Sequence, residues 1–177
     1  MNNIISVHTP LDQSVVESLR CGDFVEITGT IYTARDAAHK RLVEMIEQDR
    51  PLPFELKGQI IYYAGPCPAK PGQVIGSIGP TTSGRMDAYA PLLIQLGLSG
   101  MIGKGSRNQQ VIDAMIRYKS VYLTATGGAG ALLAQCVKKT EVIAFEDLGT
   151  EAVRKLVVEK FPVIVAIDSK GNNMYRY

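Results

Sequence analysis

The sequence has few of the residues that would assign it quickly to a functional class. Its 177 residues include three cysteines, Cys21, Cys67 and Cys136, an odd number at wide spacing. This pattern predicts neither a disulfide framework nor a metal-binding knuckle. We interpret the three residues as isolated thiols of a protein from a reducing compartment, the cytoplasm. The two histidines, His8 and His39, lie far apart, so we expect this chain to hold no metal by itself.

Charge and long hydrophobic runs are also scarce. The formal net charge is +2, with no block of like charges, whereas a nucleic-acid-binding protein normally carries a basic face. One long uncharged run, residues 88–103, contains Gln95, Ser99, three glycines and a proline, which is too interrupted for a membrane span. The first residues lack the basic start and apolar core of a secretion signal. We therefore expect one globular domain, residues 1–177, with neither a nucleic-acid nor a membrane partner.

The order of the predicted elements favours an α/β fold. β-branched residues alternate over 23–34, and apolar residues then recur at helical spacing over 35–48, with Asp36 in the first turn, where a carboxylate suits the helix dipole. Further strands are expected at 58–65, 74–79, 98–105, 120–126, 139–146, 154–161 and 162–168. Helices are expected at 85–96 and 107–119, and a glycine-rich turn that leads into a helix at 127–137.

The alternation of strands and helices in the middle of the chain implies a mainly parallel central sheet with crossover helices. The strand-rich ends of the chain suggest a second, antiparallel or mixed sheet. We therefore predict three layers in one domain: sheet, sheet and helices.

Four junctions at the ends of predicted strands are rich in glycine or hydroxyl side chains. Their sequences are TARDAAH, GPTTSGR, GKGSR and TGGAGA, and the first three contribute the cations Arg35, Arg85 and Lys104. Ligands of open α/β sheets bind at the carboxyl ends of the strands, near the unsatisfied N–H groups of helix N-termini. Because the arginine fork suits a carboxylate, the three cations together would bind a ligand such as a small dicarboxylate. Each of them alone can equally be a solvated surface residue.

The hydroxyl groups of the second junction have two interpretations. One of Thr81, Thr82 and Ser83 can cap the helix that begins near Arg85, while another faces a ligand. A threonine hydroxyl acts as a base only where nearby cations and a proton acceptor stabilise its alkoxide. The spacing of GKGSR and TGGAGA matches neither the Walker signature nor the dinucleotide fingerprint.

Asp36 and His39 raise a similar choice. They are three residues apart and therefore share a helix face. They either orient Arg35 or relay a proton, or they are a first-turn acid and an ordinary buried histidine.

Several longer motifs occur together in the order GTIYTARDAAHKRL, YYAGP, GSIGPTTSGRMD, GKG and DLGTEAV. From about residue 10 to the end, this set resembles the β subunit of class I, iron–sulfur-dependent fumarate hydratase and the C-terminal domain of its single-chain forms. The β subunit of L-tartrate dehydratase is similar but more distant. The resemblance implies a swivelling β/β/α domain, which agrees with the three layers predicted above.

The resemblance also implies an activity, a cofactor and a partner. The reaction of that family is the reversible addition of water to fumarate, giving L-malate. A 4Fe–4S cluster acts as a Lewis acid on the C2 hydroxyl, and its three cysteine ligands belong to the α part of the enzyme. This chain has no matching cysteines. It therefore looks like the β subunit of a hetero-oligomer whose α subunit carries the cluster.

Roles for individual residues follow from the same resemblance. Arg35, Arg85 and Lys104 would bind the two substrate carboxylates, and Thr81 would move the proton at C3 of malate. The supporting residues would be Asp36, His39, Thr82 and Gly84.

The chain departs from the family pattern at Ala34, often glycine there, and at Ser83, often alanine. Gly84 favours fumarate over tartrate, because the tartrate branch tends to have a bulkier residue at that position. A methyl-substituted fumarate remains an alternative substrate. A non-catalytic module that senses an anionic metabolite and a pure assembly subunit are alternative functions.

Overall fold

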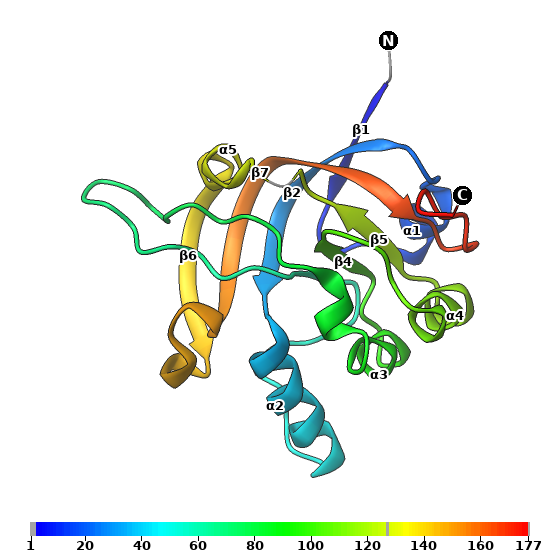
Figure 1. The fold of residues 1–177 in the computed structure, drawn as a ribbon, viewed down its shortest axis with the longest axis horizontal. Helices are drawn as coiled ribbons and strands as arrows, with labels where there is room; N and C mark the ends of the chain where they lie inside the picture. Colours follow the sequence, from blue (N-terminus) through cyan, green and yellow to red (C-terminus); the bar gives the residue numbers. More distant parts are fainter. Residues whose placement is uncertain (1–2, 127, 177) are drawn as a thin grey trace.

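The computed structural model describes residues 3–126 and 128–176 (Figure 1). Within these residues, the strands form one sheet of seven in the order β1-β2-β3-β4-β5-β7-β6. Their bounds are β1 Ile4–His8, β2 Phe24–Thr33, β3 Ile60–Tyr62, β4 Gly100–Gly103, β5 Val121–Thr124, β6 Val137–Ala144 and β7 Val153–Ile167. The helices are α1 Gln13–Ser18, α2 Asp36–Glu47, α3 Ala90–Gln95, α4 Gln109–Tyr118 and α5 Gly130–Gln135, with 3₁₀ turns η1 Ser83–Met86 and η2 Glu146–Glu151.

The predicted α/β class is confirmed, and its two sheet regions are continuous. Strands β1 to β5 run parallel to one another. Strand β7 runs antiparallel to β2, β5 and β6. Because β7 pairs with both β2 and β5, the strands β2, β3, β4, β5 and β7 close into a ring, with β1 and β6 attached outside it.

Strand β7 was predicted as two strands and is one. The sequence suggested a break at Pro162, but this residue lies in the part of β7 that pairs only with β2. The part of β7 before Pro162 also pairs with β6, and the part after it also pairs with β5. A proline that lacks the N–H donor is tolerated where the strand has a free side.

Two buried clusters hold the layers together. One takes side chains from all five ring strands, including Tyr62, and from α1 and α5. The other packs the opposite face, including Ile61 and Tyr63, against α2, α3 and α4, which lie together beneath the sheet (Figure 1). Neighbouring residues of a strand thus serve different clusters, as the pleat requires. No helix in residues 3–126 and 128–176 is long and apolar enough to cross a membrane.

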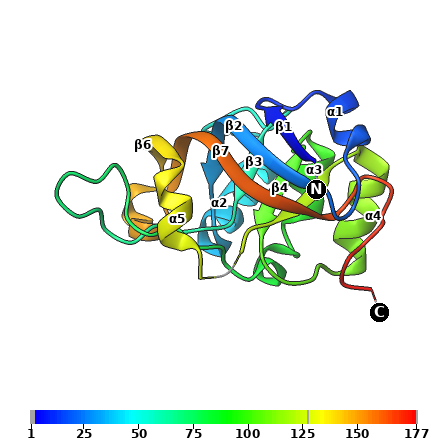
Figure 2. The same ribbon diagram turned by 90° about the horizontal axis from the view of Figure 1, so that it is seen from above.

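Two predicted elements are wrong. The predicted helix over 85–96 is divided into η1 and α3, because Pro91 has no N–H donor and is tolerated in the first turn of α3 but not in the interior of a continuous helix. The predicted strand over 74–79 is part of a loop that we call the projecting loop, residues 66–80. It extends beyond the body of the fold (Figures 1 and 2).

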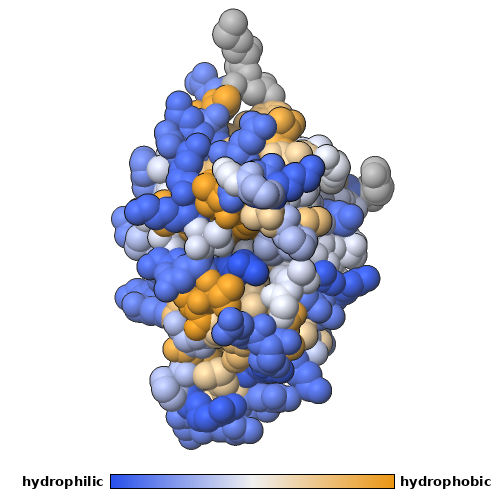
Figure 3. Space-filling view, turned by 90° about the vertical axis from the view of Figure 1, so that its left-hand side faces the viewer, coloured by the Kyte–Doolittle hydropathy of each residue, from blue (hydrophilic) through white to orange (hydrophobic). Residues whose placement is uncertain are grey.

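The projecting loop is a narrow hairpin without strands. The Cys67 N–H donates to the Ser77 carbonyl across 2.9 Å at its neck, and the Gln73 N–H donates to the Lys70 carbonyl at its tip. On one flank, the loop, α5 and β6 line a groove of about 630 Å³. Figure 3 faces this side, where apolar areas are separated by polar ones. The exposed apolar residues of the loop and of α5 include Val74 and Leu132.

Candidate functional site

The carboxyl ends of β2, β3 and β4 lie at one edge of the sheet. The three strands are parallel, and their registers pair Thr33 with Tyr62 and Tyr62 with Ile102. Arg35 follows β2 by two residues, and Lys104 follows β4 directly. Both cations are therefore carried to the same edge, where we predicted a ligand site.

The segment that contains Thr81 lies between the extensions of β3 and β4. The Thr81 N–H donates to the Tyr63 carbonyl at 2.7 Å, and the Lys104 N–H donates to the Thr81 carbonyl at 3.3 Å. The Ser83 N–H donates a hydrogen bond of 2.9 Å to the Lys104 carbonyl. Thr82 and Lys104 are thus paired as in a parallel bridge. Two separate predicted junctions meet here through their main chains.

Arg85 lies in η1, directly after this bridge, and its N–H donates to the Thr82 carbonyl at 3.4 Å. The side chains of Arg85 and Lys104 are exposed. Within the part of the chain that the structure describes, neither makes an ion pair. Both cations are therefore available to an anion from outside.

Arg35 differs from the other two cations because it is half-buried and already faces carboxylates. Its Nε lies 3.4 Å from Glu151 Oε1, and its Nη2 lies 3.8 Å from Asp36 Oδ1. Its Cδ packs 3.4 Å from the point that a Cβ on Gly65 would occupy. Asp36 therefore lies beside the guanidinium, as the hypothesis of an orienting role requires.

His39 orients the main chain of Arg35. Its Nδ1–H donates to the Arg35 carbonyl at 2.8 Å, and its own N–H donates to the same oxygen at 2.9 Å. The ring is fully buried and packs edge-on against Tyr63, with centroids 5.3 Å apart. Burial lowers the pKa of His39 to about 4, so the ring is neutral near pH 7. A neutral ring bonded to the main chain fits an orienting role better than a proton relay.

The remaining predicted residues have simpler surroundings. Thr82, the N-cap of η1, makes no side-chain cap bond, so its hydroxyl is not the capping group among the three candidates. The Ser83 hydroxyl is buried and bonds Tyr122 Oη at 2.8 Å. Gly84 is exposed, and a Cβ there would meet nothing within 4 Å. A bulkier side chain would therefore fit at Gly84 in this chain.

A buried polar cluster beneath the site escaped the sequence analysis. The side chain of Arg107 is fully buried, and its Nε donates to Asp87 Oδ1 at 2.7 Å. Its Nη2 donates to Tyr63 Oη at 3.2 Å, and its guanidinium lies 4.9 Å from the centroid of the Tyr122 ring. Burial alone lowers the pKa of Arg107, but Tyr63 and Asp87 raise it, with a net increase. Arg107 is therefore charged inside the protein.

This cluster ties together the segments that carry the predicted site residues. Tyr122 Oη donates to the Gly105 carbonyl at 2.7 Å and bonds Ser83 Oγ, while Asp87 Oδ2 accepts the Asn108 N–H at 2.8 Å. A signal for it was present in the sequence. A cation directly before a helix N-terminus is unfavourable unless a carboxylate pairs with it.

Comparison with known proteins identifies relatives along almost the whole chain. The family model described as "Fumarase C-terminus" matches residues 2–177. The chain is 45% identical over 154 residues to "Fumarate hydratase class I, anaerobic" of Escherichia coli, covering 86% of this chain and 28% of the relative. It is 44% identical over 156 residues to "Fumarate hydratase 2" of Leishmania major, covering 87% of this chain and 28% of the relative.

A relative of different length is equally similar. The chain is 44% identical over 171 residues to "Putative L(+)-tartrate dehydratase subunit beta" of Methanocaldococcus jannaschii, covering 93% of this chain and 88% of the relative. The expectation that tartrate dehydratase would be more distant is therefore wrong for this relative. The chain spans about 28% of the length of the fumarate hydratases named above, but most of the length of this subunit.

The buried pair of Arg107 and Asp87 gives a stability prediction. The substitution Asp87→Ala leaves a buried guanidinium without its counter-ion, which typically costs about 3–5 kcal/mol of unfolding free energy. Chemical denaturation followed by circular dichroism measures this loss. Asp147→Ala is the matched control, because Asp147 forms an exposed pair with Arg41 and its loss should barely move the denaturation midpoint. Equal midpoints for the two variants would contradict the prediction.

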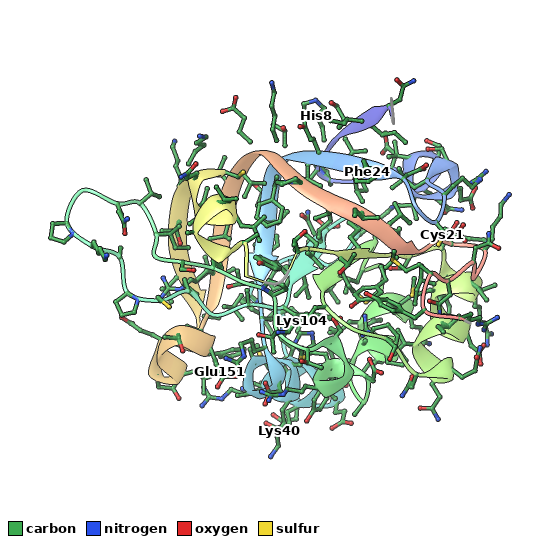
Figure 4. The ribbon with its side chains drawn as sticks, turned by 45° about the horizontal axis from the view of Figure 1, so that its top comes forward. His8, Cys21, Phe24, Lys40, Lys104 and Glu151 are labelled. Atoms are coloured by element: carbon green, nitrogen blue, oxygen red, sulfur yellow. The ribbon has the colours of Figure 1, made fainter. Side chains whose placement is uncertain are left out.

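His39 gives a prediction of pH dependence. Its folded-state pKa, about 4, is below the usual unfolded value of roughly 6.5. Between these values the unfolded state binds more protons, so the unfolding free energy falls as the pH is lowered from roughly 6.5 towards 4, by up to about 3 kcal/mol. His39→Gln should flatten this part of a stability-against-pH profile. His8→Gln should leave it unchanged, because His8 is exposed on β1 (Figure 4).

Proposed function

Because the chain belongs to the Fumarase C-terminus family, we propose that it is the β subunit of an iron–sulfur hydro-lyase that reversibly hydrates fumarate to L-malate. The single observation that best supports this proposal is the meeting of the Thr81 and Lys104 main chains at the sheet edge that also carries Arg35. A hydroxyl and a free cation on adjoining segments suit proton transfer beside a bound carboxylate.

In this proposal the three cations bind the substrate carboxylates. Arg85 and Lys104 are exposed and unpaired within the described residues, and Arg35 lies at the same edge. A charge-assisted hydrogen bond contributes about 1.5–3 kcal/mol, so a few of them hold a small dicarboxylate with little apolar burial. They also stabilise the negative charge that grows on the carboxylate when C3 loses its proton.

Thr81 is the proposed proton carrier. Its main chain is fixed on both sides, by Tyr63 through its N–H and by Lys104 through its carbonyl, so the hydroxyl is held by a rigid frame. Its alkoxide would be stabilised by the nearby cations. In this mechanism Thr81 removes the proton from C3 of malate and returns it during hydration.

The residues of this chain do not fit an iron–sulfur cluster. Cys67 is exposed on the projecting loop, while Cys21 and Cys136 are half-buried, with their thiols close to main-chain carbonyls of other segments. No group of three or more potential metal ligands occurs in residues 3–126 and 128–176. We therefore propose that an α subunit holds the cluster, which would polarise the C2 hydroxyl as a Lewis acid.

The lengths of the relatives support a partner chain. The named fumarate hydratases are more than three times as long as the matched segment, whereas the relative of nearly equal length is named as a subunit beta. This chain would then form a hetero-oligomer in the cytoplasm. L-tartrate dehydration is the second candidate function, because the relative of similar extent carries that name.

Activity of the complex is the direct test. The chain should be co-expressed with the product of the adjacent open reading frame and assayed without oxygen for malate formation from fumarate, and in parallel with L-tartrate. Arg85→Ala and Thr81→Ala should each lower kcat at least about 100-fold, because each removes a group that acts in the transition state. Lys40→Ala, an exposed cation on α2 (Figure 4), should have no effect.

Several outcomes would contradict the proposal. A complex with an intact cluster but no activity on either substrate would exclude the hydro-lyase function. Unchanged turnover in Arg85→Ala and Thr81→Ala would support the pure assembly role instead.

Binding by the isolated chain separates the enzyme from the sensing module. Half of a site offers only part of the contacts, so calorimetry with fumarate or malate should show weak or no binding to this chain alone. Tight binding would favour a module that senses a dicarboxylate.

A further inference from the structure

The turn η2, which connects β6 and β7, forms one ion pair with α2 and one with Arg35, the residue before α2. At the surface, Arg41 Nη1 donates to Asp147 Oδ1 at 2.8 Å. Beside the candidate site, Arg35 Nε lies 3.4 Å from Glu151 Oε1. Glu151 belongs to the motif DLGTEAV, for which the proposed reaction supplies no role. In Figure 4 Glu151 lies low in the view, between η2 and α2, whereas His8 and Phe24 lie at the top.

The Arg35–Glu151 pair is sheltered from water at its centre. Arg35 Nε and Glu151 Oε1 are both buried atoms without a hydrogen-bond partner in the described part of the chain. The side chains as a whole are 25% and 29% exposed. Two sheltered opposite charges stabilise each other more strongly than an exposed pair does. Because Nε forms one edge of the planar guanidinium, a carboxylate at that edge determines the direction of the two Nη atoms.

A close main-chain contact keeps Glu151 in this place. A Cβ on Gly65 would lie 2.7 Å from the Thr150 carbonyl oxygen and 3.4 Å from Arg35 Cδ. Any larger residue at position 65 would therefore push η2 away from the end of β3. The glycine at position 65 allows the main chain of the residue before Glu151 to approach closely, on the same side as Arg35 Cδ.

From this geometry we propose that Glu151 is a positioning residue for Arg35, acting through the guanidinium and not on the substrate. The inference rests on the proposed function, because it assigns Arg35 to a substrate carboxylate. In this arrangement Glu151 holds the guanidinium in one orientation before the substrate arrives. Its loss should weaken binding of the carboxylate and leave proton transfer by Thr81 nearly intact.

The substitution Glu151→Gln gives opposite results for positioning and for simple charge repulsion. Glutamine keeps the shape of the side chain and removes one negative charge near a dianionic substrate. Repulsion alone predicts a lower KM for the variant. Positioning predicts a KM about tenfold higher, with kcat changed less than threefold, in the complex of this chain with its partner subunit.

A matched control comes from the same turn. Asp147→Asn also removes one negative charge from η2 and breaks an ion pair to α2, but Asp147 pairs with Arg41 and not with Arg35. Its KM should equal that of the wild type. In an Arg35→Lys background, Glu151→Gln should have almost no further effect on KM, since both residues act through one guanidinium. Thermal unfolding of each variant verifies that the subunit is folded.

The outcomes separate the inference from the proposed function. A raised KM in Glu151→Gln alone, absent in Asp147→Asn, supports the positioning role. An unchanged or lower KM in an active enzyme overturns the inference and leaves the proposed function intact. A wild-type complex with an intact cluster that converts neither fumarate nor tartrate overturns the proposed function, and the inference with it.

Discussion

The buried cation of Arg107 is the interaction on which the rest of the site depends. It is paired with Asp87, bonded to Tyr63 and stacked near Tyr122. These three partners come from different segments, and through them the loop after β4 and the segment after the projecting loop are held together. A charge inside a protein requires a partner in a defined place. The cluster therefore restricts the main chains that carry the predicted functional side chains to one arrangement.

Above this cluster, the site is built from main-chain contacts at a sheet edge. The frame is rigid, because Thr81 is bonded to the strands on both sides. The three cationic side chains at this edge differ in exposure and in their contacts. Arg85 and Lys104 are exposed to solvent. In contrast, the Arg35 carbonyl accepts a hydrogen bond from His39, and two carboxylates lie beside its guanidinium. Within the described residues, this sheet edge thus carries one restrained cation and two exposed cations without ion pairs.

The sequence predicted much of this arrangement, because local patterns control the elements concerned. The helical period after residue 35 located α2, and the alternation before it located β2. Arg35, Arg85 and Lys104 could be selected as candidates because glycine and hydroxyl residues mark the junctions at the ends of strands. The closure of the ring was not predictable, since it depends on β7 pairing with two distant strands. The pairs Arg107–Asp87 and Arg35–Glu151 were missed for the same reason, as their partners are 20 and 116 residues apart in sequence.

The projecting loop departs from Gly65, beside Arg35, and returns at Thr81, beside Lys104. A main-chain hydrogen bond between Cys67 and Ser77 closes its neck. The distance between the two ends of the loop therefore does not depend on the residues beyond that hydrogen bond. Insertions or deletions near Lys70 would therefore alter the reach of the hairpin while the candidate site residues at its base keep their separation. The length and sequence of this tip can therefore change without rearranging the main chains beneath it.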